Sequence, residues 1–166
     1  IDFKNKLVPL IETSRAIETV TQIAAFKDVV GLFFGAADAS ASLGCKLAWE
    51  PLLYARHRVV LAASMFNLFT IDAPYFYIDK MAGLKEEAEA VKNLGFTGKA
   101  AIHPDQIDYI NEAFSPSAEE KAEAKKVLEE YQKSGGGAIK VDGQMIDEPI
   151  AEAMRLKITL GEEEKK

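Results

Sequence analysis

Cysteine is nearly absent from this 166-residue sequence, and no long run of basic residues occurs in it. The single cysteine, Cys45, excludes an internal disulfide framework and a cysteine-ligated zinc cluster. A net charge of −6 argues against nucleic acid as the main partner. No apolar stretch is long enough to span a bilayer, and no signal peptide is visible, so we expect no membrane partner. A reduced, cytoplasmic setting fits this composition.

A starting methionine is also lacking. The sequence opens on Ile1 and reaches a strand-like apolar run within a few residues, at Leu7. This start predicts the middle of a larger protein, and a fragment, a processed chain or an incompletely recorded sequence would each account for it.

Four strand-like apolar runs alternate with helical segments over residues 1–114. The expected strands cover residues 7–11, 29–35, 69–74 and 99–104. The expected helices cover residues 15–26, 51–66, 80–94 and 107–114, and a small-residue loop is expected at 39–43. Strands that alternate with helices in this way run parallel. This α/β pattern fits half of a (β/α)₈ barrel slightly better than an open parallel sheet, and a half barrel has two open edges.

Residues 115–166 carry a different pattern, which predicts a helical extension with a short hairpin. Ser117 and Glu120 form a capping box before a helix at 119–133. Asp142-Gly143 is a strong hairpin-turn signal between two short apolar runs, and a last helix is expected at 150–160. We therefore divide the chain into residues 1–114, the β/α units, and residues 115–166, the extension.

Two acids, Glu12 and Asp38, follow the first two expected strands at their carboxyl ends. Neighbouring parallel strands lie about 5 Å apart, so both carboxylates can reach one hard cation. Parallel α/β folds place their chemistry at this end of the strands. The alternative is that an acid here caps the next helix, a task that Thr13 and Ser14 can share.

Six segments in a fixed order resemble the citrate lyase beta subunit and its relatives, the HpcH/HpaI aldolase/citrate lyase superfamily, which includes malyl-CoA and citramalyl-CoA lyases. They begin with Pro-Leu-Ile-Glu-Thr (9–13), Gly-Ala-Ala-Asp (35–38), residues 53–63 and Ile-Asp (71–72), and continue with residues 94–106 and 135–149. The resemblance implies a (β/α)₈ TIM barrel with a C-terminal helical extension, assembled as a homo-oligomer, a trimer or larger. This chain would supply strands five to eight and the extension, without the first four strands.

The resemblance also implies an activity, a carbon–carbon lyase that uses Mg²⁺. Its substrate would be a 3-hydroxyacyl thioester of the citryl or malyl type, on coenzyme A or an acyl carrier protein. Its products would be an acyl thioester and a 2-oxo acid such as oxaloacetate or glyoxylate. Glu12 and Asp38 would bind the metal. The alternatives are a truncated barrel half that acts as an assembly partner, and a 2-oxo acid aldolase that uses no thioester.

Asp147 is the expected general acid/base under the same resemblance, which places it on the extension and in a neighbouring subunit's site. Its position two residues before Pro149 fits a helix N-cap equally well. Among the other polar residues, we expect His103 to be structural, Arg56 to be solvated or ion-paired and Asp72 to support the site by a hydrogen bond. Trp49 and Tyr54 are expected to pack, and the charged residues of 80–92 to be a solvated helix surface.

Overall fold

The computed structural model describes residues 6–163, which belong to two compact units, Ile1–Phe114 and Ser115–Lys166. None of the helices in the described part of the chain has both the length and the apolar character needed to cross a membrane.

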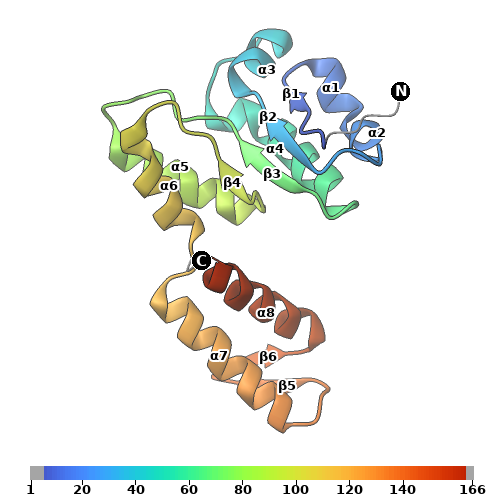
Figure 1. Ribbon diagram of the computed structural model, residues 1–166, viewed down its shortest axis with the longest axis vertical. Helices are drawn as coiled ribbons and strands as arrows, with labels where there is room; N and C mark the ends of the chain where they lie inside the picture. Colours follow the sequence, from blue (N-terminus) through green and yellow to red (C-terminus); the bar gives the residue numbers. More distant parts are fainter. Residues whose placement is uncertain (1–5, 164–166) are drawn as a thin grey trace. The chain divides into compact units, whose positions relative to one another are not determined.

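The first unit is built on a four-stranded parallel sheet with strand order β1-β2-β3-β4 (Figure 1). The strands are β1 (Leu10–Ile11), β2 (Gly31–Phe34), β3 (Phe69–Asp72) and β4 (Gly98–Lys99). The helices are α1 (Ser14–Glu18), α2 (Val20–Ala24), α3 (Ala36–Leu43), α4 (Trp49–Ser64), α5 (Met81–Leu94) and α6 (Ile107–Phe114), and a 3₁₀ turn covers Pro104–Gln106. An α/β fold with a parallel sheet is therefore confirmed.

One face of this sheet is covered and the other is open. Ile11, Leu32 and Phe34 are fully buried in the core that the helices form with the sheet. The alternate positions point the other way: Leu10 is 46% exposed and Phe69 is 40% exposed. Parallel sheets normally have both faces buried, so an apolar face is left uncovered among the described residues.

Three expectations for this unit differ from the structure. The expected loop at 39–43 is wrong, because Ala36–Leu43 forms helix α3, which ends at Gly44 in the left-handed region (φ 67°). The expected helix at 15–26 is divided at Thr19, whose hydroxyl donates to the Arg15 carbonyl at 2.9 Å. The last strand is only two residues long, and His103 caps the 3₁₀ turn by accepting from the Asp105 backbone N–H at 3.2 Å.

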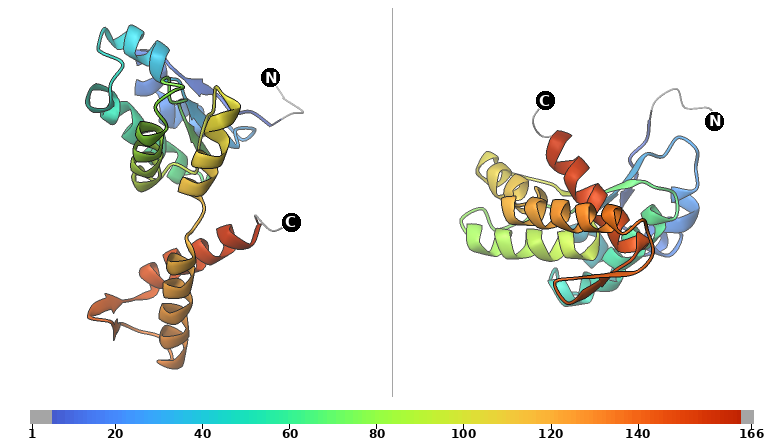
Figure 2. Two further views of the ribbon diagram at one scale, coloured as in Figure 1. Left: turned by 90° about the vertical axis from the view of Figure 1, so that its left-hand side faces the viewer. Right: turned by 90° about the horizontal axis from the view of Figure 1, so that it is seen from below.

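The second unit consists of two helices and a hairpin (Figure 2). Its elements are α7 (Ala118–Lys133), β5 (Ile139–Val141), β6 (Gln144–Ile146) and α8 (Glu148–Glu163). Both halves of the predicted capping box are present at Ser117 and Glu120. The predicted hairpin turn is confirmed, because Asp142 and Gly143 have positive φ angles of 49° and 89° between antiparallel strands.

Candidate active site

Glu12 lies at the carboxyl end of β1 and is not used as a helix cap. The hydroxyl of the next residue, Thr13, caps α1 by accepting from the Ala16 backbone N–H at 3.1 Å. The half-buried Glu12 carboxylate makes no hydrogen bond or ion pair with any residue that the structure describes. Thr13 therefore satisfies the helix start, and the acid remains available for another ligand.

Gly35 lies beside Glu12 at the end of β2. Its backbone N–H donates to the Ile11 carbonyl at 3.0 Å, which continues the parallel pairing of β1 and β2 by one residue. A Cβ atom added to Gly35 would lie 2.7 Å from the Glu12 Cβ and 3.1 Å from its Oε2. The Glu12 side chain therefore lies in space that only a glycine at position 35 leaves free.

Asp38 lies in the first turn of α3, which begins directly after Gly35. It is exposed, and like Glu12 it has no hydrogen-bond or ion-pair partner among the described residues. A carboxylate is favourable in a first turn because the helix dipole is positive there. The start of α1 is joined to α3, since the Ser14 backbone N–H donates to the Ser42 hydroxyl at 2.8 Å. The sheet order and these contacts place both acids near the carboxyl ends of β1 and β2.

The chemistry of this edge suits a hard cation. Within residues 6–163, no cluster of three or more histidine, cysteine or acidic side chains is positioned to hold a metal. Glu12 and Asp38 can therefore supply two carboxylate ligands at most. Mg²⁺ is usually bound in this way, by one or two carboxylates with water and substrate oxygens in the other positions. The residues present fit a magnesium ion.

Asp147 belongs to the second unit, where it caps α8. Its Oδ1 accepts from the Ile150 backbone N–H at 3.3 Å, and its carbonyl accepts from Ala151 at 2.9 Å. Next to it, hydrogen bonds from Arg155 and Tyr131 hold the pKa of Glu148 below its ordinary value, so this helix start carries a paired negative charge. The capping role of Asp147 is present, and no described residue donates to its second carboxylate oxygen.

A buried ion cluster lies under the same end of the sheet, and sequence reasoning found only part of it. Asp72 Oδ1 accepts from Arg56 Nε at 2.9 Å, and Asp72 Oδ2 accepts from Lys99 Nζ at 2.9 Å. Lys99 also donates to Glu87 Oε1 at 2.7 Å. The ion-paired alternative for Arg56 is confirmed. The prediction that Glu87 belongs to a solvated surface is wrong, since it faces a buried lysine.

The two aromatic residues that were expected to pack, Trp49 and Tyr54, differ in the structure. Trp49 packs as expected, with its ring centroid 4.7 Å from the Arg56 guanidinium carbon. Tyr54, on the next turn of α4, is 65% exposed, so its expected packing role is wrong. The sequence offered two signs of this cluster: Asp72 lies near the end of one expected strand, and Lys99 begins the next.

Comparison with known proteins gives the family. Residues 4–104 match the sequence model described as HpcH/HpaI aldolase/citrate lyase. Human mitochondrial citramalyl-CoA lyase is 36% identical over 170 residues, which cover 93% of this chain and 49% of that protein. This chain belongs to the HpcH/HpaI aldolase/citrate lyase family. A citrate lyase subunit beta-like protein of Mycobacterium tuberculosis is 34% identical, and 87% of this chain and 55% of that protein are covered.

Solved structures of the citrate lyase family agree with the fold. The CitE protein of Mycobacterium tuberculosis, in complex with magnesium, acetoacetate and coenzyme A, has a TM-score of 0.86 at 32% identity, covering 96% of this chain and 62% of that chain. A citrate lyase beta subunit from the same organism, complexed with oxaloacetate and magnesium, has a TM-score of 0.64. The chain spans about half the length of the curated relatives it matches.

Proposed function

We propose that this chain carries the metal-binding part of a magnesium-dependent carbon–carbon lyase that cleaves a 3-hydroxyacyl thioester. The observation that carries the proposal is the pair of unpartnered carboxylates, Glu12 and Asp38, at the carboxyl edge of β1 and β2. Relatives named as citramalyl-CoA lyase and citrate lyase subunit beta support the reaction class. Structures of relatives complexed with magnesium, oxaloacetate and coenzyme A support the ligands.

The roles of the residues follow from the reaction. Breaking the carbon–carbon bond requires removal of the proton from the substrate hydroxyl and stabilisation of the negative charge on its oxygen. Glu12 and Asp38 hold the cation, and bound Mg²⁺ would act as a Lewis acid toward the substrate oxygens. Asp147 takes the proton from the substrate hydroxyl and returns it to the enolate carbon of the acyl thioester, and its contact with the Ile150 backbone N–H fixes the orientation of the carboxylate. The products are an acyl thioester and a 2-oxo acid such as oxaloacetate or glyoxylate.

The barrel is the second part of the proposal. Strands β1–β4 act as strands five to eight of a (β/α)₈ barrel, and the open face with Val8, Leu10 and Phe69 packs against further strands or another copy. Exposed apolar surface of this kind favours association. We expect light scattering to show self-association, with a trimer or larger in the active form. A strictly monomeric chain at high concentration would contradict this part.

The stability of the chain tests the proposed ligands directly. Mg²⁺ and oxaloacetate together should raise the thermal midpoint, because a ligand at 100 times its Kd adds about 2.7 kcal/mol. A chelator should reverse the shift. Citryl and malyl thioesters, compared with the free acids, then distinguish the lyase from a free-acid aldolase. If neither ligand changes the thermal midpoint, the alternative of a non-catalytic assembly partner is supported. The open apolar face of the sheet is the observation that favours this alternative.

Gly35→Ala tests whether the space at position 35 matters to the metal site. The new methyl group would overlap Glu12, so the Mg²⁺ affinity should fall about 10-fold to 100-fold, as it does when groups that orient a ligand are lost. The backbone at Gly35 has φ −99°, so alanine adds no backbone strain. Calorimetric titration with Mg²⁺ measures the change.

Gly98→Ala is the matched control for this substitution. Its added Cβ would meet nothing closer than the Thr70 carbonyl at 4.0 Å, and Gly98 lies in the same sheet. Its Mg²⁺ affinity should equal that of the unmodified chain. If Gly35→Ala also binds Mg²⁺ normally, the ion does not use Glu12.

Asp147→Asn separates proton transfer from helix capping. Asparagine caps a helix about as well as aspartate, so the free energy of unfolding should stay the same. An amide cannot take up the proton, so the rate of thioester cleavage by the assembled oligomer should fall by about 10²-fold to 10⁴-fold. Asp147→Ala should lower the rate of thioester cleavage to the same extent, and it should also lower the free energy of unfolding by about 1 kcal/mol because the helix cap is lost. A full rate in Asp147→Asn would leave the residue with its capping role alone.

A further inference from the structure

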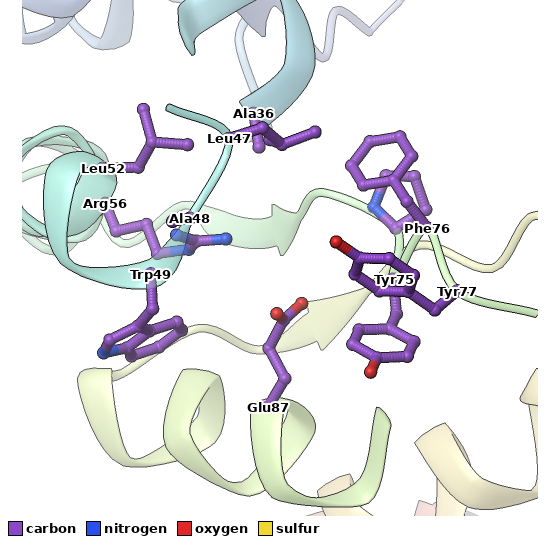
Figure 3. Close-up of a pocket in the computed structure, with 11 residues that line it drawn as sticks. Ala36, Leu47, Ala48, Trp49, Leu52, Arg56, Tyr75, Phe76, Tyr77 and Glu87 are labelled. Atoms are coloured by element: carbon purple, nitrogen blue, oxygen red, sulfur yellow. The ribbon is translucent and has the colours of Figure 1, made fainter. Parts of the chain in front are cut away.

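A pocket in the first unit is lined by neither Glu12 nor Asp38, so a ligand bound there is independent of the proposed metal site. It lies between α4, α5 and the segment after β3 (Figure 3). Its wall is mostly apolar and aromatic, with one cation and one carboxylate. The residues that matter are Trp49, Arg56, Tyr75, Tyr77 and Glu87. Pockets of this composition, apolar with a few placed polar groups, are typical of small-molecule sites.

Arg56 offers this pocket a hydrogen-bond donor that nothing in the described chain uses. The residue is only 4% exposed, and its Nε and Nη2 are both directed at Asp72, at 2.9 and 3.5 Å. The guanidinium is also held over the rings of Trp49 and Phe34, at 4.7 and 5.3 Å. The third nitrogen, Nη1, is buried and has no hydrogen-bond partner among the described residues. An unmet buried donor costs about 1–3 kcal/mol, so a group that accepts from it is favoured.

Glu87 offers the complementary acceptor from the opposite side of the pocket. Figure 3 shows its carboxylate and the Arg56 guanidinium both directed into the open space. Glu87 Oε1 accepts from Lys99 Nζ at 2.7 Å, whereas Oε2 accepts from no described residue. No ion pair joins Glu87 to Arg56 directly. The pocket therefore holds one free donor and one free acceptor, with room between them.

The charge of the cluster decides which ligand fits. Two cations, Arg56 and Lys99, are balanced by two carboxylates, Asp72 and Glu87. A carboxylate or phosphate that entered would place an uncompensated negative charge beside Glu87 in a partly buried site, which is unfavourable. A neutral group that both accepts and donates keeps the balance. We propose that this pocket binds an amide, whose carbonyl accepts from Arg56 Nη1 and whose N–H donates to Glu87, while Trp49 and the tyrosines pack on its apolar part.

Amide binding can be followed by tryptophan fluorescence, because Trp49 lines the pocket and is the only tryptophan in the chain. Titration with N-methylacetamide should change the Trp49 emission in a saturable way, with half-saturation in the range of about 1–50 mM for so small a ligand. Acetate also has an acceptor oxygen but lacks an N–H group, so its half-saturation concentration should be at least about tenfold higher than that of N-methylacetamide. Acetate binding as tightly as the amide would overturn the choice of ligand.

Three variants make the titration decisive. Ala48→Leu places bulk on the exposed lining without touching the ion cluster, and it should abolish saturation while the urea midpoint stays the same. Ala25→Leu, an exposed alanine outside the pocket, should titrate like the unmodified chain. Glu87→Gln should bring the half-saturation concentrations of acetate and N-methylacetamide closer together, because it removes the negative charge that repels acetate. An emission change that is linear, or equal in the unmodified chain and Ala48→Leu, would show that the pocket holds only solvent.

Discussion

Asp72→Asn is expected to lower the free energy of unfolding of the first unit by about 3–5 kcal/mol. The Asp72 side chain is fully buried and accepts hydrogen bonds from two cations, Arg56 and Lys99, which are themselves almost inaccessible to water. Asparagine keeps the shape but removes the charge. Arg56 would then be a buried cation without a counter-ion, and Lys99 would keep only Glu87. Breaking one member of a buried ion group costs more than the group contributes as a whole.

Urea unfolding followed by Trp49 emission reports on this unit alone, because the only tryptophan of the chain lies in it. Asp79→Asn is the matched control, because Asp79 is exposed and follows the same strand, β3. This variant should change the free energy of unfolding by no more than about 0.5 kcal/mol. Lys99→Met in the Asp72→Asn background should recover part of the loss, since it removes one of the stranded cations. A loss below about 1 kcal/mol for Asp72→Asn would mean that water reaches the cluster.

The position of the cluster in the fold explains how it stabilises the unit despite the free-energy cost of burying four charged groups. Its four side chains come from α4, β3, α5 and β4, so they join two helices to the last two strands of the sheet. Lys99 Nζ also donates to the Ala73 carbonyl at 2.7 Å, which ties down the chain directly after β3. The loop that follows forms a wall of the amide pocket. Substitution of Asp72 or Lys99, the fully buried pair of the cluster, should therefore disturb both the stability of the unit and the shape of the pocket.

Sequence reasoning was effective where the pattern is local. Apolar runs identified the positions of β1, β2 and β3, and turn chemistry identified the hairpin at Asp142 and Gly143. The fourth expected strand, 99–104, shares only Lys99 with β4. The same runs placed Glu12 directly after β1, whereas Asp38 lies in the first turn of α3, a helix that was not expected. Helix α3 was missed because its alanines and serines carry no clear apolar period, although alanine is the best helix former and Gly44 is a typical helix end.

The rest of the candidate sites depends on partners that are distant in the sequence. Lys99 meets Glu87 across two elements, and Glu87 lies in a helix where every acid has a similar sequence context. The contact of Gly35 with Glu12 depends on the register of β1 and β2, which a strand assignment alone does not give. The capping of α1 by Thr13 is by contrast a local contact, and the sequence had already offered Thr13 as a cap in place of Glu12.

Glu12→Gln and Asp38→Asn are each expected to weaken Mg²⁺ binding by about 100-fold or more, which corresponds to about 2.7 kcal/mol. An amide oxygen carries no charge, and a small hard cation depends on carboxylate ligands. Neither carboxylate has a protein partner among the described residues, so the free energy of unfolding should change by less than about 1 kcal/mol, which includes the loss of the Asp38 charge at the start of α3. The same chemical change, aspartate to asparagine, thus separates two roles: at position 72 it costs stability, and at position 38 it costs metal binding.

Calorimetric titration with Mg²⁺ measures the affinity, and urea unfolding of the same samples measures the stability. Glu18→Gln is the matched control, because Glu18 is an exposed acid on α1, the helix that follows Glu12. It removes the same charge from the same unit and should bind Mg²⁺ like the unmodified chain. The double variant should bind Mg²⁺ more weakly than either single variant, since both carboxylates are lost from the same ion. Unchanged affinity in either single variant would remove that residue from the site and, with it, the basis for the proposed lyase.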